Sequence, residues 1–554
     1  MGNYTIIETQ KINKQTKDCI IDLTLETITK NKQVLIFNNS KRSSETVAVK
    51  IFESIKNIKN KEELKKISKD ILSTLSNPTK QCIKLSKCVE KGVAFHHSGL
   101  LGKQRSIIEK NFKNGLIKVI SSTPTLAAGL NLPAYQVIIK DYKRYSQRGF
   151  NDIPILEYHQ MAGRAGRPGK EEIGKTILCV GNENEKDRII PKYIFGKPEE
   201  IISKLAVEPT LKMYLLSLIS MDLINTKTEI SEFFKNTLYA QQYKDLTGLE
   251  NNIFRILDIL IEYDFIQEED HYFVATKMGK KISELYLNPD TANYFINNIN
   301  KFINNYKKNE NSKNNLYSLI HFIVNTLEMR PLFNIKKIEE EEYSNKLEKI
   351  EPILEIKYDP FEDDYQTYLS TIKTTEIFMD WISEAPENYI SEKYKITPGE
   401  LHYKLETLDW LLYSLEEITI MKKKIYFKNI LNKIRTQFKY GIKKELLPFI
   451  HLKGIGRVKA RKLYDNNFKN LLDLKMASYE KLSSIIGDSL TIKITKELNS
   501  NENFSNEYIE RKKEKPKEIK IRDIQDEEIE ELVTNYNIFE KEKQEKNKKL
   551  LDYF

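Results

Sequence analysis

The chain has 554 residues, a length that predicts several domains rather than one. Its 89 lysines and arginines against 79 aspartates and glutamates give a formal net charge of +10, which favours a polyanionic partner over an acidic or neutral one. Four cysteines, no two of them spaced as CxxC, exclude a disulfide framework and a cysteine-built metal site and indicate a reducing, cytoplasmic setting. No apolar stretch approaches the roughly 20 residues that span a bilayer, so we expect no membrane association.

The expected elements change character along the chain. Up to about residue 190, short apolar runs such as residues 34–37 and 117–120 alternate with helical segments, which is typical of a parallel α/β sheet. Long amphipathic helices follow, interrupted at residues 264–276 by a hairpin pattern that predicts a winged helix. Residues 501–554 are rich in lysine and glutamate and indicate a solvated, partly disordered tail.

One short segment, residues 160–168 (QMAGRAGRP), predicts phosphate chemistry. Arg164 and Arg167 lie three residues apart, each after a glycine, so that on a helical turn they share one face and a ligand can approach the backbone closely. An arginine placed on a transferring phosphoryl group contributes on the order of 10³ to 10⁵ in rate. A basic surface helix is the alternative interpretation of this segment alone.

The segment resembles motif VI (QxxGRxGR) of superfamily 2 helicases, and three upstream segments resemble other motifs of their Ski-like branch. Residues 122–134 (STPTLAAGLNLPA) are similar to motif V, residues 95–100 (FHHSGL) to motif IVa and residues 34–42 to motif IV. The four segments occur in the order of the family. By this resemblance, which covers roughly residues 20–500, the chain is identified as a member of that branch.

The resemblance implies a role for each matching residue. Three residues would act catalytically at the ATP phosphates: Gln160, Arg164 and Arg167, with Arg167 as the expected arginine finger. Three would line the nucleotide cleft: Gly129, Asn131 and Gly163. Three would lie along the nucleic-acid backbone: His96, His97 and Thr123. Packing at a strand end is the alternative for the two histidines, and we expect no metal site because the seven histidines form no ligand-spaced cluster.

Two segments imitate elements of an ATP site. Residues 169–176 (GKEEIGKT) match the P-loop pattern, but a P-loop leaves a strand and opens a helix, and here that order is inverted. Residues 268–271 (EEDH) resemble a DExH box without its first aspartate. We therefore expect the first RecA-like domain, with its P-loop and magnesium ligands, on a separate polypeptide; a truncated product that binds nucleic acid without hydrolysing ATP is the alternative.

Residues 137–156 contain two apolar runs around SQRGFN, which predicts a hairpin. At this place the archaeal fork-processing Hel-type DNA helicases of the branch carry a pin that separates the strands. Four residues would supply its charge and its wedge: Lys143, Arg144, Tyr145 and Phe150. A plain hairpin at the sheet edge is the alternative.

Residues 399–417 resemble the ratchet helix of the same helicases, which presents an arginine and a tryptophan to single-stranded bases. Trp410 matches the tryptophan, but Tyr403 stands where the arginine is expected. A tyrosine can still stack on a base, worth about 1–3 kcal/mol. The cation would then come from His402 or Lys404, and core packing is the alternative for Trp410.

Residues 452–463 (LKGIGRVKARKL) resemble a helix-hairpin-helix, whose turn exposes backbone amides to phosphate. Its contacts, unless the hairpin is purely structural, would be Gly454, Gly456, Arg457, Lys459 and Arg461. The final eight residues (NKKLLDYF) have the spacing of a peptide that binds the sliding clamp PCNA, although charged tails also end in aromatics by chance. Its hydrophobic plug would be Leu550, Tyr553 and Phe554.

The resemblance implies six segments. They are a linker (1–30), a second RecA-like α/β domain (31–190), a winged helix (191–286), a ratchet bundle (287–444), a helix-hairpin-helix (445–500) and a charged tail (501–554). The implied function is that of the C-terminal part of an ATP- and Mg²⁺-dependent 3′-to-5′ DNA helicase for forked DNA in replication restart and repair. An RNA helicase of the same branch and a non-catalytic DNA-binding or clamp-tethering subunit are the alternatives.

Overall fold

The computed structural model divides the chain into two units, one up to Leu471 and one from Leu472. It describes residues 12, 14–56, 59–75, 77–127, 131–146, 149–166, 173–205, 207–243, 246–354 and 364–500. Five predicted site residues lie outside these ranges: Gly129, Arg167, Leu550, Tyr553 and Phe554. Within the ranges, each helix is too short or too polar to cross a bilayer.

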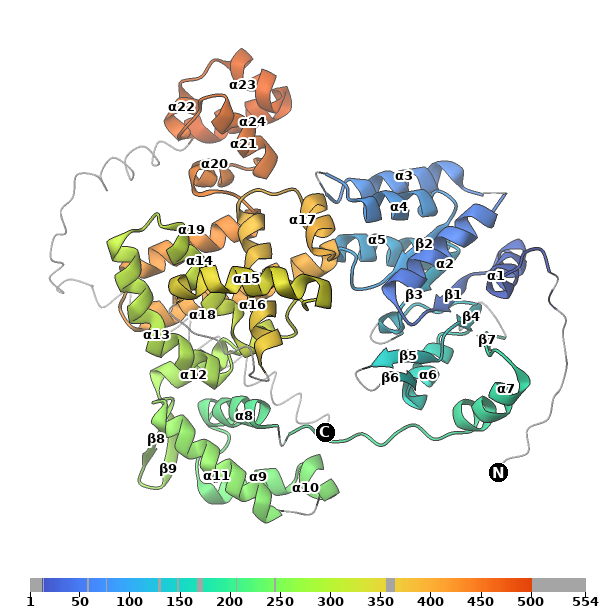
Figure 1. The fold of residues 1–554 in the computed structure, drawn as a ribbon, viewed down its shortest axis with the longest axis horizontal. Coiled ribbons are helices and arrows are strands. Elements are labelled where there is room, and N and C mark those ends of the chain that lie inside the picture. Colours follow the sequence, from blue (N-terminus) through green and yellow to red (C-terminus); the bar gives the residue numbers. More distant parts are fainter. Residues whose placement is uncertain are drawn as a thin grey trace, which may run out of the picture. The chain divides into compact units, whose positions relative to one another are not determined.

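A parallel sheet of five strands organises the N-terminal domain, in the order β2-β3-β1-β4-β7 (Figure 1). Its strands are β1 (Val34–Phe37), β2 (Val93–His96), β3 (Val119–Ser122), β4 (Gln136–Ile139) and β7 (Lys175–Leu178). Every residue of β1 to β4 is buried, because a parallel sheet is covered on both faces. The parallel sheet that the sequence predicts is thereby confirmed.

Helices and one hairpin surround this sheet. The helical elements are α1 (Cys19–Thr29), α2 (Lys41–Ser54), α3 (Lys61–Leu72), α4 (Lys80–Val89), α5 (Gly102–Lys113), η1 (Pro124–Leu126), α6 (Ile155–Ala162), α7 (Glu183–Ile189) and η2 (Ile190–Ile194). Helix α2 packs on β2 and β3, and α6 packs on β4. The hairpin is formed by β5 (Lys143–Ser146) and β6 (Gly149–Asp152), where the sequence predicts one. The buried side chains from Ile20 to Tyr193 form the core of this domain.

The next region is helical with one short antiparallel hairpin. Its elements are α8 (Glu208–Ser220), α9 (Lys227–Lys235), α10 (Leu238–Tyr243), α11 (Leu246–Glu262), β8 (Ile266–Glu269), β9 (Tyr272–Ala275) and α12 (Lys277–Glu284). An isolated antiparallel bridge joins Thr226 to Tyr272 on β9. The hairpin lies where the sequence predicts the wing; the assignment as a winged helix stays a prediction.

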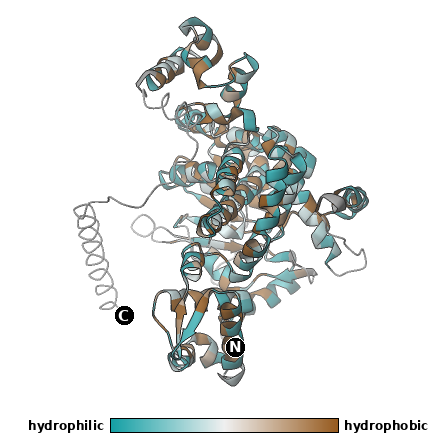
Figure 2. Cartoon of the chain, turned by 90° about the vertical axis from the view of Figure 1, so that its left-hand side faces the viewer, coloured by the Kyte–Doolittle hydropathy of each residue, from teal (hydrophilic) through white to brown (hydrophobic). Residues whose placement is uncertain are grey.

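A helical bundle follows, and its core is continuous with that of the preceding region. Its elements are α13 (Pro289–Lys308), α14 (Lys313–Val324), η3 (Leu327–Met329), α15 (Lys337–Leu354), α16 (Tyr365–Ile382), α17 (Glu387–Tyr394), α18 (Pro398–Met421) and α19 (Ile425–Tyr440). Buried side chains from Leu211 to Phe438 form one hydrophobic cluster. Most helices carry both hydrophobic and hydrophilic residues along their length (Figure 2), as helices with one buried face do.

Short helices around glycine turns complete the described chain. They are η4 (Lys444–Leu446), α20 (Leu447–Ile450), α21 (Arg457–Asp465), α22 (Leu471–Lys475), α23 (Tyr479–Ile486) and α24 (Asp488–Ser500). Gly454, between α20 and α21, has φ +90°, and Gly487, between α23 and α24, has φ +85°. Both values lie in the region that glycine adopts without strain. The helix-hairpin-helix assignment stays a prediction.

Candidate functional site

The carboxyl ends of the parallel strands bring three polar segments of the sequence to one edge of the sheet. The backbone N–H of Asn38, after β1, donates to the Ser122 carbonyl at the end of β3 (2.8 Å). The N–H of Thr123 donates to the His96 carbonyl at the end of β2 (3.3 Å), and its hydroxyl lies 2.9 Å from that of Thr125. Open α/β sheets bind ligands at this edge, which makes it a candidate site.

Arg164 joins the two segments that resemble motifs V and VI. Its Nη2 donates to the Ala127 carbonyl, just beyond η1, while its own carbonyl accepts from the Ala134 N–H at 2.9 Å. Gln160 and Gly163 are exposed on the last turn of α6 and at its end, beside Arg164 in sequence, and Asn131 is exposed too. The Arg164 Nε is buried and has no hydrogen-bond partner among the described atoms. The guanidinium therefore keeps a donor for a further acceptor, which fits a phosphate group.

The end of the P-loop look-alike is part of a strand. Lys175 and Thr176 begin β7, which pairs with β4. A P-loop needs these two residues at the start of a helix, because the amides of that helix cradle the phosphates. This segment therefore does not have the geometry of a P-loop.

His96 and His97 lie inside the α/β domain. His96 is 4% exposed, and its Nε2 lies 2.9 Å from the Glu109 carboxylate. His97 is fully buried, and its Nδ1 accepts from the Gly99 N–H at 3.1 Å. These contacts make the two histidines supports of the loop that follows β2, and a role at the nucleic-acid backbone stays a prediction.

The predicted pin is an antiparallel hairpin whose basic residues pair with acidic ones of its own domain. Lys143 lies 2.9 Å from Glu185, and Arg144 lies 3.0 Å from Glu157. The Phe150 side chain is 70% exposed. The Tyr145 side chain lies outside the described atoms. Exposed ion pairs contribute little to stability, so these two cations remain available to exchange partners.

The two aromatic residues of α18 differ in their surroundings. Tyr403 is 61% exposed, whereas Trp410 is half-buried against the helical core and donates its indole N–H to the Leu285 carbonyl at 3.0 Å. They lie seven residues apart, so they share one face of the helix. Tyr403 is therefore the more accessible of the two for stacking.

Neither proposed source of a cation on α18 is free for nucleic acid. Lys404 is buried and donates to the Met329 carbonyl at 2.5 Å, and burial lowers its pKa. The His402 Nε2 lies 3.3 Å from the Glu387 carboxylate, and its ring meets the Trp381 ring edge to face. Both side chains contribute to packing.

One cation beside this helix comes from α19 and was not among the residues predicted from the sequence. Arg435 binds both oxygens of Asp409 at 2.7 and 3.0 Å, and its guanidinium lies 4.8 Å from the centre of the Tyr413 ring. Arg435 lies outside residues 399–417, the segment that resembles the ratchet helix, because its side chain reaches α18 from the following helix. Only the packing of α18 on α19 shows the contact.

Two arginines of the predicted helix-hairpin-helix are bound within the protein. Arg457 donates to the Ala385 carbonyl and lies over the Trp381 ring at 5.2 Å. Arg461 binds both oxygens of Glu384, at 2.6 and 2.8 Å, and also contacts Glu445. Lys459 is half-buried, and Gly456 caps α21 with open space around its Cα. The two glycines and Lys459 remain the candidates for phosphate contact.

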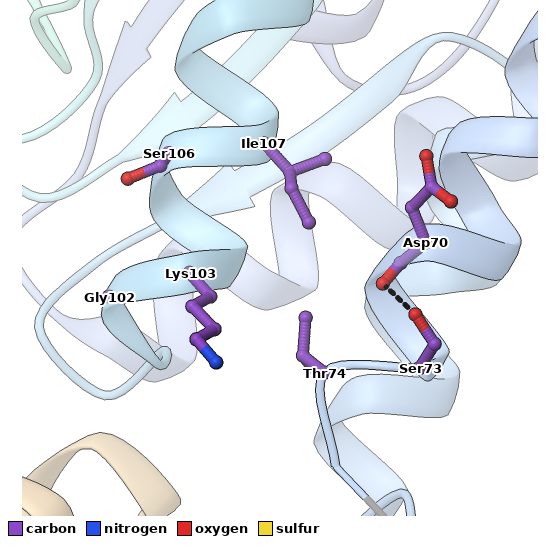
Figure 3. Close-up of a pocket in the computed structure, with 7 residues that line it drawn as sticks. All are labelled: Asp70, Ser73, Thr74, Gly102, Lys103, Ser106 and Ile107. Atoms are coloured by element: carbon purple, nitrogen blue, oxygen red, sulfur yellow. Dashed lines mark hydrogen bonds between the residues drawn. The ribbon is translucent and has the colours of Figure 1, made fainter. Parts of the chain in front are cut away.

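A shallow hollow lies between α3 and α5, away from these residues. Figure 3 shows Lys103 and Ile107 of α5 on one side of the hollow and Asp70 of α3, with Ser73 just after the end of that helix, on the other. The Ser73 hydroxyl donates to the Asp70 carbonyl. None of the predicted site residues lines this hollow. Within the described part of the chain, no group of three or more histidine, cysteine, aspartate or glutamate side chains is placed to hold a metal ion.

Two protein families match separate parts of the chain. Residues 71–169 match the helicase conserved C-terminal domain, and residues 317–441 match domain 4 of archaeal helicases. The first match contains the segments similar to motifs IVa, V and VI. The second contains α18 and α19.

The chain is similar to the ATP-dependent DNA helicases Hel308 of several archaea. It is 35% identical to that of Methanococcus vannielii, covering 87% of this chain and 68% of the relative. It is 37% identical to that of Pyrococcus horikoshii and 36% to that of Pyrococcus abyssi, in each case covering 84% of this chain and 64% of the relative. The chain thus spans about two thirds of the length of these relatives. By its sequence and its domains, the chain belongs to the archaeal Hel308 family of superfamily 2 helicases.

Proposed function

We propose that the chain is the C-terminal part of an ATP-dependent DNA helicase that unwinds forked DNA in the 3′-to-5′ direction during replication restart and repair. The contact between Arg164 and the Ala127 carbonyl carries this proposal, because it brings motif VI onto motif V and leaves a donor for phosphate. In this proposal, a first RecA-like domain on a separate polypeptide supplies the P-loop and the Mg²⁺ ligands. Bound ATP with Mg²⁺ supplies the phosphoryl group whose transfer drives movement.

Within that assembly, the residues of this chain have separate tasks. Gln160, Arg164 and Arg167 bind and orient the phosphates from the second RecA-like domain, beside Gly129, Asn131 and Gly163. The hairpin with Phe150 separates the strands, and Tyr403 with Trp410 holds single-stranded bases. The glycine turn at Gly454 and Gly456, together with Lys459, binds the phosphates of the emerging strand. The terminal peptide with Leu550, Tyr553 and Phe554 tethers the protein to PCNA.

The proposal is tested by adding a first RecA-like domain of the family to the purified chain and measuring ATP hydrolysis with and without forked DNA. We expect DNA to stimulate hydrolysis, and Arg164→Ala to reduce the rate by about 10³-fold or more. Arg255→Ala is the matched control, because Arg255 is half exposed and pairs with Glu208 far along the chain from motif VI.

Two results would contradict the proposal. The absence of hydrolysis in every pairing would leave a DNA-binding subunit, and equal rates for the two arginine variants would remove the role of Arg164. Competition between DNA and RNA forks in the same assay distinguishes a DNA helicase from an RNA helicase. We expect the DNA fork to compete at lower concentration.

A further inference from the structure

The loop after β2 lies directly on the first turn of α18, although about 300 residues separate them. The N–H of Gly399 donates to the Gly99 carbonyl at 3.0 Å. Gly99 is buried, and a Cβ added to it would lie 3.0 Å from the Thr397 hydroxyl. We call this contact, made by residues 97–101 and 397–400, the loop–helix joint.

The joint requires glycine at position 399, because there is no space there for a Cβ atom. A Cβ at this position would lie 2.7 Å from the Gly99 carbonyl carbon and from the Leu100 carbonyl oxygen, and nearer still to the Ser98 oxygen. All three are backbone atoms, so no side chain can turn away to make room. Any larger residue must push the loop off the helix.

An ion pair of Glu400, the residue after Gly399, also contributes to the joint. Lys41, the first residue of α2, lies 2.6 Å from one oxygen of Glu400. The other oxygen of Glu400 accepts from the Thr397 N–H and hydroxyl at 2.8 and 2.7 Å, which caps α18. Burial acts to raise the pKa of Glu400, but Lys41 and Thr397 lower it overall. The same carboxylate therefore caps the helix and ties it to the α/β domain.

The loop is held in place from within its own domain. The His97 ring accepts from the Gly99 N–H and lies 3.4 Å from Glu45. Burial opposes the charge of Glu45, but hydrogen bonds from His97, Lys84 and Gln81 lower its pKa to about 2. The loop thus presents the Gly99 carbonyl from a charged and fully packed support.

We propose that the loop–helix joint makes the α/β domain and α18 move as one body. Gly399, Glu400 and Lys41 are positioning residues, and Tyr403 lies four residues, or about 6 Å, further along the same helix. A movement of the nucleotide-binding domain then displaces the aromatic face of α18 without a hinge between them. The link to DNA stepping rests on the function proposed above; the rigid connection does not.

The test compares Gly399→Ala with Gly102→Ala in the full chain by hydrogen exchange at increasing urea. Gly102 is the first residue of α5, and a Cβ there meets only the end of the Arg105 side chain at 4.0 Å, so this variant is the matched control. In the wild-type protein, we expect β1 and α18 to lose protection at the same urea concentration. In Gly399→Ala, peptides covering residues 97–101 and 397–401 should exchange at least tenfold faster, and the two transitions should separate.

A second variant, Lys41→Met, removes the ion pair and leaves the backbone contact, so it should accelerate exchange in the same peptides by a smaller factor. Exchange in Gly399→Ala equal to that of Gly102→Ala would overturn the proposal. With a first RecA-like domain added, Gly399→Ala should keep DNA-stimulated ATP hydrolysis within about threefold and lose at least tenfold in unwinding. If the proposed helicase function is wrong, neither the wild-type protein nor Gly399→Ala hydrolyses ATP with the added domain. The difference in hydrogen exchange between Gly399→Ala and Gly102→Ala persists in that case.

Discussion

The edge of the parallel sheet and the helical region place their polar residues by different means. At the sheet edge, Asn38, His97 and Thr123 each follow a strand, and the strand register alone brings their backbones together. In the helical region, the surroundings of a residue depend on which other helices cover it. Arg461 is bound to Glu384 by this packing, although its sequence context resembles a phosphate-binding turn. A sequence motif therefore predicts the surroundings of its polar residues better at the edge of the sheet than on the helices.

The largest effect that tests this difference is expected from Arg461→Ala. The change leaves the carboxylate of Glu384, which is 12% exposed, without its two hydrogen bonds from the guanidinium. Because both partners are only partly buried, we expect the free energy of unfolding to fall by about 2–3 kcal/mol. Urea unfolding followed by the fluorescence of the chain's two tryptophans, both in the bundle, measures it.

The neighbouring Lys462→Ala is the control for this prediction. Lys462 is exposed, so its removal should change the free energy of unfolding by less than about 0.5 kcal/mol. Suppose that Arg461→Ala is as stable as Lys462→Ala but binds DNA much more weakly than Lys462→Ala does. Arg461 would then be a DNA contact rather than an internal anchor. That result would mean that a sequence motif predicts the role of a residue as well in the helical region as at the sheet edge.

The second effect separates the two aromatic residues of α18. Tyr403→Ala removes an exposed ring, so we expect the affinity for single-stranded DNA to fall about 5- to 100-fold, with little change in stability. Trp410→Phe removes the hydrogen bond to the Leu285 carbonyl, so we expect a loss of about 1 kcal/mol in unfolding free energy. Fluorescence anisotropy of a labelled oligonucleotide and urea unfolding measure the two quantities. The opposite assignment of effects would show that Trp410 is the main stacking residue.

The sequence predicts the α/β domain well because its signals are local. Buried strands such as residues 34–37 are continuous apolar runs, and SQRGFN gives a turn between paired strands, so β1 and the β5–β6 hairpin lie where expected. The motifs then follow from the strand ends. The inverted order around residues 169–176 also identifies a false P-loop, since Lys175 begins a strand.

The surroundings of charged residues on the helices could not be predicted in the same way. Lys404 follows the exposed Tyr403 directly, yet it is buried under η3 and donates to the Met329 carbonyl. Arg435 places a cation beside α18 from the following helix, outside the residues 399–417 that resemble the ratchet helix. Both contacts join residues distant in the chain, and helical periodicity does not specify which neighbour covers a face. The loop–helix joint is of the same kind, since Gly399 and Gly99 meet only in the folded protein.

The smallest effect concerns the pH dependence of Lys404. Burial lowers the pKa of this lysine below its ordinary value of 10.5, so the unfolded state binds the proton more tightly than the folded state. Between the lowered pKa and 10.5, the unfolded state therefore carries more protons, and the contribution of Lys404 to stability rises with pH. Below the lowered pKa, the penalty for burying the charge is present in full.

Lys404→Met removes this titration while keeping an unbranched side chain of similar length. We expect the free energy of unfolding of the wild-type protein to rise relative to that of the variant as the pH increases from 7 towards 10.5, as measured by urea unfolding at several pH values. A constant difference over this range would mean that the folded chain holds the Lys404 proton as tightly as the unfolded chain does, and that this part of α18 is open to solvent. A constant difference together with a loss of DNA affinity in the variant would show that Lys404 contacts nucleic acid. In that case the contacts of Lys404 within the folded chain would be no better a guide to its role than the sequence motif.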